Sequence, residues 1–238
     1  MPTDCLFRDD SYGKDCMARV TAVTAQGGIV LDRTVFYATS GGQPGDSGAL
    51  IRSDGSRIAI ETAIFTDAAK SEIAHIPPTG APPPTVGEPV TAEIDWEPRY
   101  SRMRMHTALH LLTAALPYAV TGGSVGATEG RLDFDIPDGG LNKEAISAKL
   151  AAMIATDAEV TSRWITDPEL AANPALVKTM SVKPPAGTGR VRLIEIDGID
   201  LQPCGGTHVR HLSEIGAVQV SQIEKKGKLN RRVRIVFV

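Results

Sequence analysis

The chain has 238 residues, of which 42% are hydrophobic and 22% charged, so it is long enough for one large or two small domains and has an ordinary globular composition. Its formal net charge of -3 argues against a surface that coats nucleic acid all over. No run of 18 apolar residues occurs, and the first ten residues carry acids in place of a basic and apolar leader, so we expect no membrane helix and no secretory signal and predict a cytoplasmic protein.

The N-terminal part predicts a β domain. Short apolar runs are separated by Gly, Asp and Ser turns, and no long helical period occurs; the runs are Ala18–Ala22, Gly28–Leu31 and Arg57–Ile60. The Pro-rich stretch Pro77–Pro89 cannot form a helix and is typical of a surface loop or linker. We therefore place a domain boundary in this region, with one domain over residues 1–90 and a second over residues 91–238.

The second domain mixes helices and strands. Met105, Leu109 and Leu112 recur at helical spacing and predict a helix over Ser101–Leu116. Asn142 can cap a second helix over Lys143–Ala155. The further predicted elements are a strand over Asp157–Ile165, a short helix from Asp167 and Pro168, a strand over Arg190–Ile196, and a hairpin of Glu214–Ile223 with Arg231–Val238. Helices that are separate from hairpin-connected strands predict an α+β layer structure.

Two short pairs of metal-ligating residues lie far apart in the sequence. His106 and His110 are four residues apart on the predicted helix, so both imidazoles leave the same face. Cys204 and His208 flank two glycines and a threonine in the motif CGGTH. The other two cysteines, Cys5 and Cys16, are most simply small buried side chains, because an odd number of distant cysteines does not form a disulfide framework.

Together the two pairs supply three nitrogens and one sulfur, a donor set that zinc takes in tetrahedral geometry. Each pair is weak evidence alone, but the two together predict a zinc site. A site of four protein ligands is usually closed and structural, and catalysis there would need one ligand to move aside or the coordination to expand. The residues leave both possibilities open.

Four segments resemble the AlaX family of stand-alone alanyl-tRNA editing proteins, and equally the editing domain of alanyl-tRNA synthetase. They are TVFYATSGGQPGDSG (Thr34–Gly48), IDWEPRYSRMRMHTALHLL (Ile94–Leu112), IDGIDLQPCGGTHVRHLSEIG (Ile196–Gly216) and KKGKLNRRVRI (Lys225–Ile235). The resemblance implies the medium-length class: a Gly-rich, β-barrel-like N-terminal domain, then an α/β two-layer editing domain with an antiparallel sheet.

The resemblance also implies the reaction. The family hydrolyses the ester that joins a wrong amino acid to the terminal adenosine of tRNA(Ala), chiefly serine, with glycine as a candidate second substrate. An activation pocket built for alanine rejects serine poorly, so a second site that removes the wrong product restores fidelity. Zinc, held by His106, His110, Cys204 and His208 as the catalytic cluster, could polarise the ester carbonyl, activate water or orient the substrate.

Further polar residues are candidates for substrate binding. Thr107 lies between the two helix ligands, Thr207 lies within CGGTH, and Ser124 and Thr128 follow the first helix, where the family has its amino-acid-selecting residues. Each could instead be a turn or cap residue. Gly41, Gly42 and Gln43 match the release-factor tripeptide, but a glycine turn with a structural glutamine is the better interpretation.

Two basic segments are candidates for contact with the tRNA acceptor end. Six of the ten residues from Lys225 to Arg234 are basic, among them Arg231 and Arg232, and a second cluster comprises Arg99, Arg102 and Arg104. Local patches of this kind can hold a phosphate backbone on an otherwise acidic protein, although a solvated hairpin rim explains the first cluster equally well. The sequence leaves the oligomeric state open.

The residues argue against two other functions and leave a third open. The chain has no recognisable ATP-binding motif, so aminoacylation by a complete alanyl-tRNA synthetase is rejected. The helix reads HTALH and lacks the glutamate that HExxH peptidases use as a base. The remaining alternative is a tRNA-binding module in which the zinc is structural and no chemistry occurs.

Overall fold

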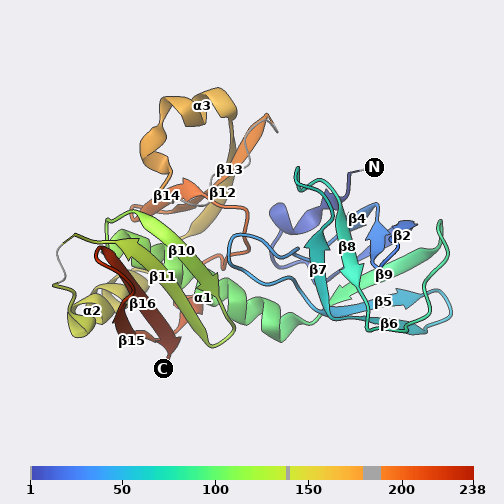
Figure 1. The fold of residues 1–238 in the computed structure, drawn as a ribbon, viewed down its shortest axis with the longest axis horizontal. Coiled ribbons are helices and arrows are strands. Elements are labelled where there is room, and N and C mark those ends of the chain that lie inside the picture. Colours follow the sequence, from blue (N-terminus) through green and yellow to red (C-terminus); the bar gives the residue numbers. More distant parts are fainter. Residues whose placement is uncertain (1, 138–139, 179–188) are drawn as a thin grey trace. The chain divides into compact units, whose positions relative to one another are not determined.

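The computed structural model describes residues 2–137, 140–178 and 189–238. They form two compact units, Met1–Tyr100 and Ser101–Val238 (Figure 1). Strand β9, at Pro89–Ile94, lies across the boundary predicted between residues 90 and 91 and pairs with two strands of the first unit. The assignment of separate functions to residues 1–90 and 91–238 stays a prediction.

The first unit contains a nearly closed antiparallel sheet. Within the residues that the structure describes, its strand order is β6-β5-β9-β2-β3-β8-β7. The two edge strands β6 (Arg57–Ile60) and β7 (Thr62–Phe65) are separated only by Glu61, so consecutive strands bring the two edges together and the sheet is barrel-like. The other strands are β2 (Asp15–Val23), β3 (Ile29–Leu31), β5 (Gly48–Arg52) and β8 (Ile73–Ile76), with a short parallel pair β1 (Asp4–Cys5) and β4 (Arg33–Thr34) beside a 3-10 helix η1 (Leu6–Arg8).

The barrel interior follows the alternation of its strands. Ile58 and Ile60 of β6 are buried and their neighbours are exposed, as expected for a strand with one face in a core. Gly41 and Gly42 have φ of 57° and 82°, a conformation that glycine adopts without strain. The turn closes between Ser40 and Gln43, and the side chain of Gln43 is buried, which agrees with a structural glutamine.

The second unit packs helices on one face of an antiparallel sheet. The sheet order is β10-β11-β16-β15, and the strands are β10 (Val120–Val125), β11 (Glu129–Asp135), β15 (Val218–Lys225) and β16 (Asn230–Phe237). Helix α1 (Trp96–Ala115) reaches the sheet at Gly130, where an added Cβ would lie 2.7 Å from Met105 Sδ. Helix α2 (Lys143–Ile154) packs on β15 (Figure 1). The expected mixture of helices with a mostly antiparallel sheet is confirmed.

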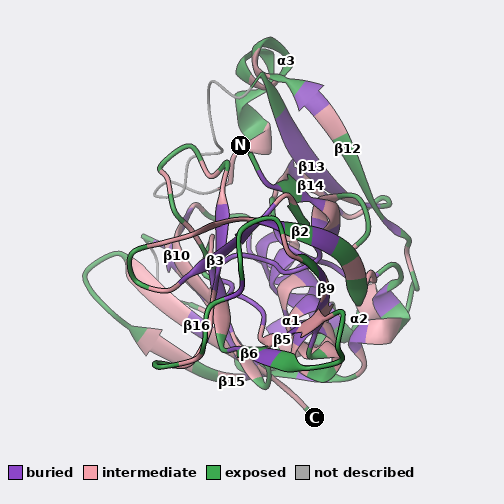
Figure 2. Ribbon diagram, turned by 90° about the vertical axis from the view of Figure 1, so that its right-hand side faces the viewer, coloured by how far each residue is buried: buried purple, intermediate pink, exposed green. Residues whose placement is uncertain are grey.

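A separate three-stranded sheet carries the metal loop. Its order is β12-β13-β14, with β12 at Val160–Thr166, β13 at Arg190–Ile196 and β14 at Asp200–Pro203. The central strand β13 is almost wholly buried (Figure 2). Helix α3 (Asp167–Ala172) packs on β12 and β13, and η2 (Pro174–Leu176) contacts β14. After the metal loop, η3 (Leu212–Ile215) packs on α2.

Several predicted elements agree with the structure. The strand Arg190–Ile196 has the predicted bounds, the short helix begins at Asp167, and the Asn142 side chain caps α2 by accepting a hydrogen bond from the Ala145 backbone at 2.7 Å. The first helix begins at Trp96, five residues earlier than predicted, because Pro98 is tolerated in its first turn.

Two predicted strand starts are wrong. Asp157 has a φ of 50° and lies in a turn, so β12 begins only at Val160. Glu214 belongs to η3, and the following strand begins at Val218. Among the described residues, no helix combines the length and apolar character that crossing a membrane requires.

Candidate metal centre

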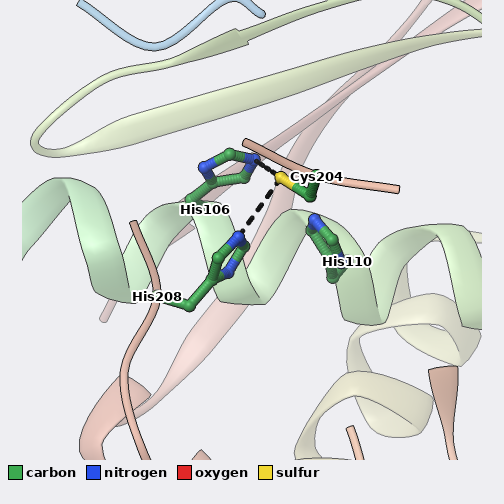
Figure 3. Close-up of side chains that lie close together, drawn as sticks. All are labelled: His106, His110, Cys204 and His208. Atoms are coloured by element: carbon green, nitrogen blue, oxygen red, sulfur yellow. Dashed lines mark hydrogen bonds between the residues drawn. The ribbon is translucent and has the colours of Figure 1, made fainter. Parts of the chain in front are cut away.

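The two predicted ligand pairs meet at one place in the second unit. His106 and His110 lie one turn apart on α1, Cys204 directly follows β14, and His208 lies in the loop before η3 (Figure 3). The four ligand atoms all lie within 4.8 Å of one another. Residues about a hundred positions apart in the sequence are thus brought to one small volume.

The spacing around the Cys204 sulfur fits a tetrahedral ion. Zinc bonds of about 2.0 to 2.3 Å at tetrahedral angles place neighbouring ligand atoms roughly 3.3 to 3.7 Å apart. The Cys204 sulfur lies 3.5 Å from His106 Nε2 and 3.3 Å from His208 Nε2 (Figure 3). The donor set and its spacing therefore fit a metal such as zinc.

Electrostatics prepares the sulfur for metal binding. Burial opposes ionisation of the Cys204 thiol, but the neighbouring His106 and a hydrogen bond from His110 outweigh it and hold the pKa of the thiol well below its usual range. Burial also lowers the pKa of His208 to about 3, with a further contribution from His106, so this imidazole is neutral at pH 7. A thiolate beside a neutral imidazole is the protonation state that a metal requires.

The tautomer of His208 follows from one hydroxyl group. Thr107 Oγ1 lies 3.0 Å from the Met103 carbonyl, to which it donates its only hydrogen, and 3.1 Å from His208 Nδ1. The hydroxyl oxygen must then accept a proton from His208 Nδ1, which leaves Nε2 free to bind a metal. The Val209 backbone N–H donates to the same oxygen at 3.3 Å.

Thr107 therefore supports a ligand. The residue is fully buried, and its hydroxyl is taken up by the three partners. Its position between the two helix histidines makes Thr107 a candidate for substrate binding, but its contact with His208 in the distant CGGTH loop depends on the fold and has no signal in the sequence.

The loop that carries Cys204 is held by a buried arginine. Arg192, on β13, donates from Nη1 to the carbonyl of Gly206 at 2.8 Å and to that of Cys204 at 3.3 Å. The Gly206 N–H in turn donates to the Cys204 sulfur at 3.4 Å. Sequence reasoning missed Arg192 because nothing in the chain around residue 192 marks it as more than a strand residue.

The other candidate pocket residues lie in different surroundings. Thr207 is fully buried in the metal loop. Ser124 points to the face of the sheet away from α1, because its neighbour Gly123 faces buried Leu132 and successive strand residues alternate between faces. Thr128 is exposed at the turn between β10 and β11.

The predicted basic patches differ from expectation. Arg99 is fully buried in the first unit, where its Nε donates to Asp46 at 2.9 Å and its Nη1 to the Ser11 carbonyl, so the prediction that it contacts phosphate is wrong. Arg232 forms a two-pronged ion pair with Asp133 at 2.7 and 2.9 Å. Arg231 folds back on carbonyls of its own hairpin, among them that of Gly227.

The family model described as the threonyl and alanyl tRNA synthetase second additional domain matches residues 191–234, and that of the class II (A) tRNA synthetases matches residues 11–98. The alanyl-tRNA editing protein AlaX-M of Methanosarcina mazei is 35% identical, over 97% of this chain and 95% of its own length. Its counterpart in Saccharolobus solfataricus is 34% identical over 97% of each chain. An alanine–tRNA ligase of Pyrobaculum arsenaticum is 31% identical over 92% of this chain and 25% of its own length. With all four ligand positions gathered at one centre and similarity along almost its entire length, this chain belongs to the AlaX family of alanyl-tRNA editing proteins.

Proposed function

We propose that this protein hydrolyses the ester of mischarged tRNA(Ala), chiefly seryl-tRNA(Ala), with glycyl-tRNA(Ala) as a second candidate substrate. The observation that carries the proposal is the convergence of His106, His110, Cys204 and His208, whose ligand atoms lie within 4.8 Å of one another. Membership of a family whose relatives are named alanyl-tRNA editing proteins supports the substrate class.

Zinc is the metal that we propose for this centre. Three imidazoles and a thiolate suit zinc better than calcium or magnesium, which prefer oxygen ligands. When bound, the ion supplies a Lewis acid beside the ester carbonyl.

The burial of the four ligands supports catalysis over a closed structural site. His110 and His208 are buried, whereas His106 and Cys204 are only half-buried. A substrate can therefore approach along the side of the cluster formed by His106 and Cys204. The residues behind the cluster, Thr107 and Arg192, hold the ligands in place, as catalysis by a preorganised site requires.

We place the tRNA contact at the tip of the β15–β16 hairpin. Lys225, Lys226 and Lys228 are exposed there, with Leu229 beside them. The arginines nearer the middle of the sheet contribute less, because Asp133 neutralises Arg232 and Glu224 and Glu129 pair with Arg234. A small cluster of lysines at the hairpin tip can bind phosphate locally even though the net charge of the protein is negative.

A deacylation assay tests the proposal against the binding-module alternative. Seryl-, glycyl- and alanyl-tRNA(Ala) are incubated with wild-type protein, with Cys204→Ala and with Cys16→Ser as the matched cysteine control. We expect seryl-tRNA to be hydrolysed at least 100-fold faster than alanyl-tRNA, because a pocket built to bind a hydroxyl rejects a substrate that lacks it.

The control should retain wild-type activity, and Cys204→Ala should lose both activity and metal while keeping its circular dichroism spectrum. If the folded, zinc-loaded wild type hydrolyses seryl-tRNA(Ala) no faster than the background rate, the proposal is wrong. Retained tRNA binding in that protein would then support a binding module with structural zinc.

A further inference from the structure

The side of His110 that faces away from the cluster borders a buried polar network. Its Nδ1 lies 3.1 Å from Asp200 Oδ2 and 3.1 Å from Gln202 Nε2. Both partners come from β14, the strand that leads into Cys204. The Asp200 side chain has no exposed surface, yet its second oxygen is in contact with the Lys178 ammonium.

Each proton in this network can be assigned. Thr113 donates its hydroxyl hydrogen to the His110 carbonyl at 2.7 Å, so its oxygen accepts one amide hydrogen of Gln202 at 3.1 Å. The other amide hydrogen of Gln202 goes to Asp200 Oδ2 at 2.7 Å. Both amide hydrogens are then used.

His110 Nδ1 therefore donates to Asp200, and it does not accept from Gln202. A carboxylate has no hydrogen to give, so Nδ1 carries a proton, and Nε2 is the nitrogen that offers its lone pair when a metal is bound. Nε2 is the atom directed toward the cluster, as it is in His208. Two different partners, a carboxylate and a hydroxyl, thus set the same tautomer in two ligands.

We propose that Asp200 is a positioning residue of the metal centre: its carboxylate, held by Gln202 and Lys178, fixes His110 as an Nε2 ligand and strengthens its bond to the ion. The proposal rests on the metal site proposed above. A carboxylate that accepts the far proton of a ligating imidazole orients the ring and raises its basicity.

The charges around the cluster support this role. A divalent ion with the Cys204 thiolate has a net charge of about +1. The Asp200 carboxylate, behind His110, offsets that charge from a buried position where screening by water is weak. Lys178, whose side chain is about one-third exposed, pairs with the same carboxylate and offsets part of its charge. The partner of His208 Nδ1 is the neutral hydroxyl of Thr107, so we expect His110 to be the stronger imidazole ligand.

Zinc affinity tests the proposal without reference to hydrolysis. Wild type, Asp200→Asn and the control Asp197→Asn compete for zinc with a chromogenic chelator at one pH. Asp197 is exposed in the turn before β14, so its variant should bind as the wild type does. Asp200→Asn removes the charge at constant size, and we expect its zinc dissociation constant to rise about 10- to 100-fold.

A second readout separates positioning from general packing. Long-range proton–nitrogen NMR of the histidine rings in zinc-loaded protein should show His110 with its proton on Nδ1 in the wild type and a displaced Nδ1 signal in Asp200→Asn. If Asp200→Asn fails to fold, Gln202→Leu takes its place; it removes the amide that orients the Asp200 carboxylate without changing any charge, and it should weaken zinc binding to a smaller degree.

The outcomes are distinct. Wild-type zinc affinity in Asp200→Asn, or in Gln202→Leu if that variant is used, would overturn the positioning role and leave the proposed hydrolase standing. A wild-type protein that binds no zinc would overturn the metal centre itself.

Discussion

His75 is a histidine that the fold keeps neutral. It is fully buried in the barrel, where its Nδ1 lies 2.9 Å from the Ile29 carbonyl and its Nε2 lies 2.8 Å from the Thr34 hydroxyl. Thr34 Oγ1 also accepts a hydrogen bond from the Phe36 backbone. Burial lowers the pKa of His75 to about 4, and the hydrogen bond to Ile29 opposes this only in part.

This shift predicts a loss of stability in mild acid. Because the folded-state pKa is below the unfolded value of 6.5, the unfolded chain binds the proton more readily, so the contribution is complete above pH 6.5 and is lost as the pH falls toward 4. The total loss is about 3 kcal/mol, or about 1 kcal/mol per pH unit. In urea unfolding from pH 7 to pH 5, the change of stability with pH should be smaller in His75→Gln than in the wild type by about 1 kcal/mol per pH unit, whereas His211→Gln, an exposed control, should match the wild type. The same dependence of stability on pH in all three proteins would contradict this role of His75.

Thr107 offers a second residue-scale prediction. Thr107→Val removes the acceptor for His208 Nδ1 and for the Val209 N–H, whereas Thr107→Ser keeps the hydroxyl. We expect the valine variant to bind zinc about 10-fold more weakly than the serine variant, because the ligand loses its orienting partner. Chelator competition on the two proteins measures the difference. Identical affinities would show that the hydroxyl does not orient His208.

At the scale of elements, the sequence predicts a helix or strand well when the residues that start or stop it lie within a few positions of one another. Asn142 at the start of α2 and Pro168 in the first turn of α3 are local signals visible in the sequence. The structure adds a capping box between Thr166 and Glu169. Strands β10 and β11 were missed, because glycines such as Gly122, Gly123 and Gly130 interrupt the alternating pattern. Gly130 is glycine for a tertiary reason, the close approach of Met105, and no local pattern reports that.

In the β15–β16 hairpin, the arginines of the sheet form ion pairs, whereas lysines at the tip are exposed to solvent. Arg232 and Arg234 form ion pairs across the sheet, so reversing their charges would break those pairs as well as any phosphate contact. The double variant Lys225→Glu, Lys228→Glu avoids this problem. It should weaken tRNA binding and reduce the slope of log affinity against log salt by about 1 to 2. Lys149→Glu, on the exposed side of α2, is the control. A slope equal to that of the control would show the tip to be a solvated rim.

At the scale of the whole molecule, the sequence predicts the four metal-ligating residues better than it predicts the residues that support them. The four ligands lie in two compact motifs whose residue types and spacing indicate a metal, and the structure brings them together. Asp200 and Arg192 support that centre from β14 and β13, and their roles depend on strand pairing across the three-stranded sheet. Arg99 shows the opposite failure, since a basic residue in a basic cluster turned out to be a buried partner of Asp46.

The central claim is that a metal held by these four residues is required for ester hydrolysis. The most direct measurement is the initial rate of seryl-tRNA(Ala) deacylation by one protein preparation, after removal of metal with a chelator and again after reconstitution with one equivalent of zinc. We predict that the stripped protein, still folded by circular dichroism, falls to the background rate and that zinc restores the activity. Hydrolysis that continues unchanged in the metal-free protein would contradict the account.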